Sequence, residues 1–98
     1  QRVTDPRKLA RGKPCLIRLP GCDGGGETTV LAHYRLAGTC GIGMKPAHWQ
    51  AAWACCHCHS IIDGRERPPP GYTKNDVRLA HAEGVVRTLY ELDKTGEL

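Results

Sequence analysis

Three cysteines and two histidines lie within the short segment Trp53–Asp63. Cys55 and Cys58 are separated by two residues, a spacing that lets both thiolates reach one zinc ion from a tight turn. His59 follows directly, and Asp63 lies four residues further on. If this part is helical, residues four apart share a face and could bind a second ion. The segment therefore predicts a structural ion and a catalytic ion on one turn and one helix.

Two further cysteines could complete the structural site. Cys15 and Cys22 flank a short extended piece that ends in Pro20-Gly21, a strong turn signal. A chain that turns back there would bring both thiols together, although the loop is longer than in a usual zinc knuckle. Four thiolates make a closed tetrahedral zinc site that contributes folding energy directly. Cys40 and Cys56 are left over, and the sequence gives them no role.

The amino-acid composition indicates that the fold needs a stabilising cross-link such as a metal site. The chain has 98 residues, no Phe, twelve Gly and seven Pro, which predicts one domain with a thin core. Residues 1–13 are polar and basic, and no apolar run suggests export or a membrane span. We therefore expect a cytoplasmic protein, no membrane partner, and cysteines that bind metal. A secreted domain held by disulfides is the alternative.

Positive charge is concentrated at the start of the chain. The net charge is +4, yet residues 1–18 carry six Lys or Arg against Asp5 alone. The remainder holds eight basic and nine acidic residues. A basic arm over 1–14 on a near-neutral body predicts a polyanionic partner. A solvated terminal segment without a partner would show the same composition.

The elements that must position these residues can be placed from local patterns. The β-branched segment Thr28–Tyr34 predicts a strand that carries His33 near its end. A brief second strand over Ala51–Ala54 leads into the Cys55 turn, and a helix then runs to about Asp63. Together these elements form a predicted core over residues 15–64.

A second helix is expected after a stiff linker. Residues 65–72 contain three consecutive prolines. Thr73 reads as an N-cap with Asp76 in the first turn, and the helix should run from Lys74 to about Lys94 within residues 73–95. We expect the lone His81 to be partly packed. The helix carries two apolar stripes, so one can cover the core while the other could bind a partner, including a second copy of the chain. The first stripe consists of Val77, Ala80, Val85, Leu89 and Leu92, and the second of Leu79, Ala82, Val86 and Tyr90.

The order of strand with histidine, loop, strand and CxxCH opening a helix resembles the ββα-metal motif of HNH-type nucleases within a treble-clef zinc finger. The segments 27–41 and 52–63 resemble more closely the YbcO-like family of prophage proteins, which are regarded as nucleases. The likeness covers roughly residues 10–92 and is most specific in those two segments. It implies a small zinc-stapled α+β domain, in a bacterial host, that cuts DNA.

Site roles follow from this resemblance. His33 matches the general base of HNH enzymes, and His59 matches the histidine that binds the catalytic ion, such as Mg²⁺, Mn²⁺ or Ni²⁺. Asp63 matches a further ion ligand, while Cys15, Cys22, Cys55 and Cys58 match the zinc ligands. Arg35 lies two residues after His33, hence on the same face of an extended chain, where it could clamp the scissile phosphate. The basic arm would contact DNA phosphates.

The sequence departs from the HNH pattern at two positions. Ala32 stands where many HNH proteins have an ion ligand, and the central asparagine is missing, with Gln50 the nearest candidate. Glu27, water and substrate phosphate could complete the shell of the ion. These departures leave a second hypothesis open, a non-catalytic zinc module that binds DNA or protein.

Overall fold

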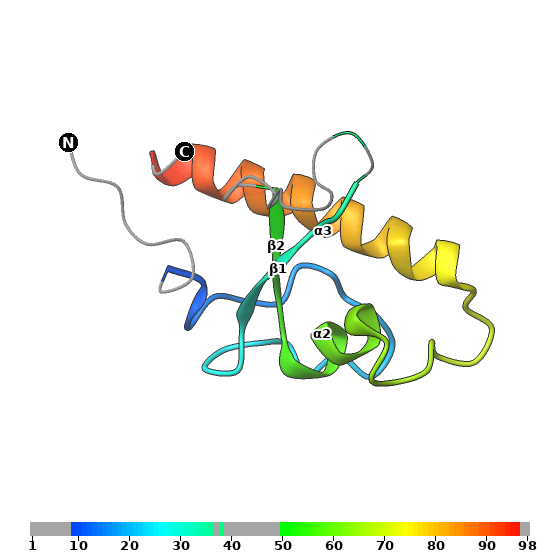
Figure 1. Cartoon of the computed structure of the whole chain (residues 1–98). Coiled ribbons are helices and arrows are strands. Elements are labelled where there is room, and N and C mark those ends of the chain that lie inside the picture. The colour runs from blue at the N-terminus through cyan, green and yellow to red at the C-terminus, as the bar shows by residue number, and fades with distance from the viewer. Residues whose placement is uncertain (1–8, 37, 39–49, 97–98) are drawn as a thin grey trace.

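The computed structural model describes residues 9–36, 38 and 50–96, and within them two short strands precede two helices. Strand β1 spans Val30–His33 and β2 spans Ala51–Ala54. Helix α2 spans Cys56–Asp63 and α3 spans Lys74–Thr95. In Figure 1 the strands occupy the centre, α3 runs along one side of them and α2 lies on the other side. The small α+β class expected from the sequence is confirmed.

The two strands pair antiparallel in the register Val30↔Ala54 to His33↔Ala51. The second strand has the predicted bounds, but the first is shorter than the Thr28–Tyr34 segment expected. Thr29 stabilises the preceding loop instead, because its Oγ1 donates to Lys13 O at 2.6 Å and accepts from Gly26 N at 2.8 Å. The β-branched pair at 28–29 therefore misled the strand prediction.

Helix α2 begins inside the CxxC turn, as the sequence predicts. Its N-cap is Cys55, whose sulfur accepts from Cys58 N at 3.4 Å. Gly64 ends the helix at φ 85°, a left-handed conformation that favours glycine. The helix is just long enough to present His59 and Asp63 one turn apart on one face.

Helix α3 also has the expected start. Thr73 Oγ1 accepts from Asp76 N at 3.1 Å, and Asp76 Oδ2 accepts from Thr73 N at 2.8 Å, which forms a complete capping box. The helix continues one residue past the predicted Lys94 and ends at Thr95, with Gly96 as its C-cap. The first predicted stripe packs on the core, since Val77 is buried and Ala80, Val85 and Leu92 are partly buried against it. The other buried residues of α3 belong to neither predicted stripe: His81, Gly84 and Thr88.

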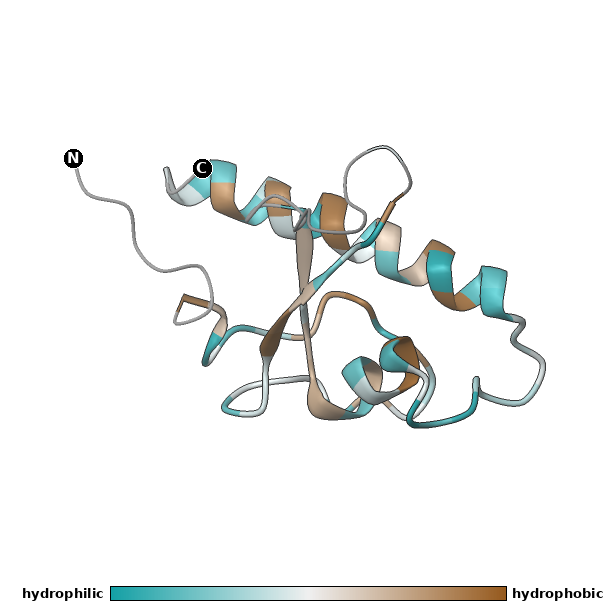
Figure 2. Cartoon of the chain, viewed as in Figure 1, coloured by the Kyte–Doolittle hydropathy of each residue, from teal (hydrophilic) through white to brown (hydrophobic). Residues whose placement is uncertain are grey.

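Small residues let α3 approach β2 closely. A Cβ on Gly84 would lie 2.9 Å from Ile17 Cγ1 and 3.2 Å from Ala52 Cβ, too close for any side chain without movement. Thr88 then hydrogen-bonds across the contact, with its Oγ1 accepting from Trp53 N at 3.1 Å. Figure 2 shows largely apolar strands against a helix that mixes polar and apolar positions. This packing fixes the long helix on the hairpin.

The last residues of the predicted basic arm pack against the body. Ala10 is fully buried in a cluster with Leu16 and Trp53, and Lys13 Nζ lies 5.5 Å from the centre of the Trp53 ring. Residues 1–8 lie outside the described part of the chain. Of the helices within the described ranges, neither combines the length and apolar character needed to cross a membrane.

Candidate metal centre and active site

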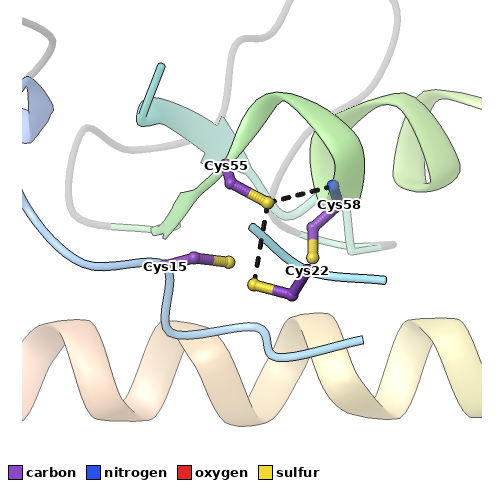
Figure 3. A group of neighbouring side chains, drawn as sticks. All are labelled: Cys15, Cys22, Cys55 and Cys58. Atoms are coloured by element: carbon purple, nitrogen blue, oxygen red, sulfur yellow. Dashed lines mark hydrogen bonds between the residues drawn. The ribbon is translucent and has the colours of Figure 1, made fainter. Parts of the chain in front are cut away.

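Four cysteine sulfurs converge on one point between the Cys15–Cys22 loop and the start of α2. Figure 3 shows the side chains of Cys15 and Cys22 meeting those of Cys55 and Cys58. The four sulfur atoms all lie within 4.8 Å of one another. They form the one group of three or more potential ligands close enough to hold a metal ion in the described ranges. The four cysteines singled out by spacing are thus brought together.

The spacing of the sulfurs fits zinc. Tetrahedral zinc with Zn–S bonds of about 2.3 Å places its sulfurs about 3.8 Å apart. The Cys22 and Cys55 sulfurs are 3.7 Å apart, and the five cysteines described are free thiols. Backbone N–H groups also face the sulfurs, since Gly24 N lies 3.3 Å from Cys22 Sγ. A closed Cys₄ site of this kind can hold a structural metal ion.

The protonation of the cluster also favours a cation. A hydrogen bond from Cys58 lowers the pKa of Cys15 to about 4 and raises the pKa of Cys58 itself. Burial raises the pKa of Cys22 to about 11. These shifts favour a thiolate at Cys15 beside thiols at Cys22 and Cys58. A divalent cation replaces those protons and relieves the repulsion among the thiolates.

A separate pocket of about 180 Å³ lies between the end of β1, the end of α2 and the first half of α3. It brings together three residues that the sequence singled out: His33, Arg35 and Asp63. It is also lined by residues that the sequence did not indicate as site residues: Tyr34, Ile62, Val77, Arg78 and His81. The pocket therefore unites the first strand and the metal-motif helix on one concave surface.

His59 is connected to this pocket through Asp63. His59 Nε2 lies 3.4 Å from Asp63 Oδ2, across one turn of α2. Arg65, which the sequence analysis did not consider, approaches both groups. Its Nη2 lies 3.2 Å from Asp63 Oδ2 and 3.3 Å from His59 Nδ1. A guanidinium thus sits beside the two groups expected to bind the catalytic ion.

Aromatic packing forms the α3 side of the pocket. His81 is 4% exposed, and its Nε2 lies 2.9 Å from Ala32 O. Its ring meets the Tyr34 ring edge to face, with centroids 5.0 Å apart. The guanidinium carbon of Arg78 lies 4.9 Å from the centre of the Tyr34 ring, and Arg78 donates to the Tyr34 hydroxyl at 3.2 Å. Burial lowers the pKa of His81, so this ring is a neutral structural contact.

The remaining predicted residues are placed as follows. Gln50 Nε2 donates to Tyr34 O at 2.8 Å, so it joins the two strands directly beside His33. Ala32 is buried within β1 and carries no ligand atom in its side chain. Glu27 is exposed in the loop before β1 and is absent from the pocket lining. Cys56 is exposed, while Cys40 lies outside the described residues.

A larger groove of about 430 Å³ lies on the other flank of α3 and shares no residue with the pocket. It contains no histidine or cysteine, so its side chains offer no metal site of the predicted kind. The chemistry is therefore concentrated in the smaller pocket. Fold and site together define a small α+β protein with a cluster of four cysteines that can hold a metal ion and a separate histidine-containing pocket.

Comparisons with known proteins identify the family of the chain. The family described as "Putative nuclease YbcO" matches residues 4–97. "Putative nuclease YbcO" of Escherichia coli K12 and "Putative nuclease ybcO" of Enterobacteria phage 82 are each 47% identical over 88 residues, covering 88% of both chains. A solved structure of a putative bacteriophage protein from E. coli K-12 superposes with a TM-score of 0.76 at 36% identity, covering 94% of this chain and 100% of that one. The chain belongs to the YbcO family.

Proposed function

We propose that this protein is a metal-dependent DNA endonuclease of HNH type, built on a ββα-metal motif within a treble-clef zinc finger. The observation that carries the proposal is the single pocket lined by His33, Arg35 and Asp63, with His59 in contact with Asp63. The nuclease name of the YbcO relatives supports a phosphodiester substrate. The Cys₄ centre would hold a structural zinc ion.

The pair formed by His59 and Asp63 fits a second divalent ion. Two ligand atoms at about 2.1 Å from an ion and at right angles lie about 3 Å apart, and the observed separation is 3.4 Å. Both groups are partly exposed, so water and substrate phosphate can complete the shell. When bound, such an ion stabilises the charge on the pentavalent phosphate and the departing 3′ oxygen.

The chain's own residues supply the other parts of the reaction. The imidazole of His33 accepts a proton from a water molecule, whose oxygen forms the new bond to phosphorus as the bond to the 3′ oxygen breaks. Arg35 and Arg78 line the same pocket and attract the phosphate. Gln50 ties the ends of the two strands together and limits the movement of His33.

Plasmid nicking by the zinc-loaded protein with added Mg²⁺, Mn²⁺ or Ni²⁺ tests this function. We expect His33→Ala to lose roughly 10²–10⁴-fold in rate, the usual contribution of a general base. His57→Ala is the matched control, because His57 bonds Pro20 O at 3.1 Å and does not line the pocket. A His33→Ala variant that cuts as fast as the parent shows that the base is assigned wrongly.

The position of Arg65 favours a second candidate, a zinc-stabilised module that binds DNA or protein without cutting. Its guanidinium already neutralises Asp63, which leaves less negative charge for an ion. This candidate predicts no divalent-ion site beyond the cysteine centre. Titration of Mn²⁺ into zinc-saturated protein separates the two, because a weaker second site that disappears in His59→Ala supports the enzyme.

A further inference from the structure

An apolar stripe on α3 faces away from the core. Leu79, Val86 and Tyr90 are 58%, 66% and 62% exposed. Their spacings of seven and four residues put them on one face of the helix. The buried residues Val77, His81, Gly84 and Thr88 lie on the opposite face. The stripe is therefore not needed for folding.

Charged residues border one side of this stripe in a particular order. Helical geometry places Asp76, Glu83, Arg87 and Lys94 on the same flank, with the acids in the N-terminal half and the bases in the C-terminal half. A second α3 laid antiparallel would bring each acid near a base. A parallel copy would instead place this flank against the opposite flank of the partner helix, so these acids and bases would not meet.

One register satisfies the apolar and the charged positions together. When Leu79 lies opposite the partner's Tyr90, Glu83 faces the partner's Arg87 to within one residue. Asp76 likewise faces the partner's Lys94 to within one residue. Each contact occurs twice because the arrangement is two-fold symmetric. Glu83 and Lys94 already make ion pairs within their own helix, so the new contacts extend existing pairs into a network.

The large groove on the same flank offers space for the partner's side chains. It is lined by Leu79, Ala80 and Glu83 from α3 and by Leu19 and Tyr72 from the chain beside it. In the register above, the partner's Tyr90 lies over Leu79 at the edge of this groove. The volume of about 430 Å³ is sufficient for one aromatic side chain. The catalytic pocket uses none of these residues.

We propose that a second copy of this chain docks antiparallel on this face of α3, with Tyr90 of each copy entering the groove of the other. A single helix pair makes a small interface, so we expect association at roughly 10–100 μM. The inference depends on the exposed face alone and is independent of the proposed nuclease activity.

Sedimentation equilibrium of the zinc-loaded chain tests the association. We expect the mass to rise from 10.7 kDa toward twice that value as concentration increases. Val86→Glu should weaken the dimer at least tenfold, because it buries two like charges. Val30→Glu is the matched control at an exposed position on β1 and should leave the affinity within about twofold. A chain that stays monomeric at about 500 μM overturns the proposal and leaves the face to a different protein.

Disulfide trapping tests the register, in a Cys40→Ser and Cys56→Ser background with the four metal ligands zinc-bound. A bridge requires Cα atoms within about 7 Å. Mixing Leu79→Cys protein with Tyr90→Cys protein should give a disulfide-linked heterodimer. Neither variant alone should form a covalent dimer. In this register residue 79 of one copy lies eleven residues, or about 16 Å, along the helix from residue 79 of the other copy, and the same holds for residue 90. Covalent homodimers of Leu79→Cys would indicate parallel helices and refute the model.

Discussion

At the scale of single residues, adjacent cysteines have opposite environments. Cys55 is fully buried and its sulfur lies in the four-sulfur cluster, whereas Cys56 is exposed and takes no part in it. Since the main core cluster has only four large aliphatic side chains beside three alanines and three cysteines, a metal ion on the four cysteines should supply much of the folding energy. A substitution of Cys56 can therefore serve as the control for the same substitution of Cys55.

Cys55→Ser should release the structural ion and lower the free energy of unfolding by roughly 4 kcal/mol or more, the range typical of losing a metal site. Cys56→Ser should stay within about 0.5 kcal/mol of the parent. Urea unfolding with parallel measurement of bound zinc checks both values. Equal stability of the two variants would show that the cluster does not hold the fold together.

Arg65 shows how one exposed side chain can tune the proposed ion site. Its guanidinium contacts both Asp63 and His59, so it must move when an ion binds there. We expect Arg65→Ala to raise the Mn²⁺ affinity of zinc-loaded protein by up to about fivefold, because an exposed pair contributes about 0–1 kcal/mol. Arg67→Ala, on the same loop, should leave the affinity unchanged. Weaker binding in Arg65→Ala would mean that the arginine assists the ion.

At the scale of elements, α3 is attached to β1 through a buried histidine. His81 lies 2.9 Å from Ala32 O and packs on Tyr34. The ionisable groups that act on it electrostatically are Arg78, His59 and Asp63. Burial dominates and lowers its pKa, so the folded protein holds this ring neutral.

This linkage makes stability depend on pH. Above the ordinary histidine pKa of about 6.5 the contact is fully present. Below that pH the histidine binds a proton in the unfolded chain but not in the folded chain. The free energy of unfolding therefore decreases as the pH is lowered, by up to about 1.4 kcal/mol per pH unit. Urea unfolding of zinc-saturated protein from pH 7.5 to 5.5 should show a shallower decline for His81→Gln than for the parent. His57→Gln should keep the parental slope, and an unchanged slope in His81→Gln would contradict the assignment.

At the scale of the whole molecule, the charge distribution suits a polyanion. Six of fourteen basic residues lie in the first eighteen positions, and the proposed active site adds Arg35, Arg65 and Arg78. Basic residues at the start of the chain and in the proposed active site would allow the chain to bind a DNA backbone while the scissile phosphate lies at His33. Binding should therefore depend strongly on salt.

Changing Arg2, Arg7 and Lys8 together to Gln should reduce the slope of log affinity against log salt by up to about 2.7, from about 0.9 per lost phosphate contact. Changing Lys74, Arg67 and Lys94 to Gln removes the same charge elsewhere and should alter the slope much less. Fluorescence anisotropy with a labelled duplex at several salt concentrations measures both. Equal slopes would show that the start of the chain does not touch DNA.

Local signals placed most of the elements. The CxxC turn, the Thr73 cap with Asp76, and the apolar segment Ala51–Ala54 each predict a boundary within one or two residues, because capping and turn chemistry act over a few neighbours. The predicted strand that carries His33 begins too early, because the Thr29 side chain hydrogen-bonds Lys13 O in the preceding loop instead. Side-chain to backbone bonds of this kind depend on residues distant in sequence, here Lys13.

The sequence by itself determined the donors of the metal centre, because cysteine spacing reports the geometry of a turn, and it determined that His33, Arg35, Asp63 and His59 are the chemical candidates. Only the tertiary structure decided that three of these four line one pocket, that Arg78 and Tyr34 line it with them, and that Arg65 contacts Asp63 and His59. Arg78 comes from α3, whose close approach to β2 depends on Gly84 fitting against Ala52. Such contacts arise from the packing of whole elements, and no local pattern records them.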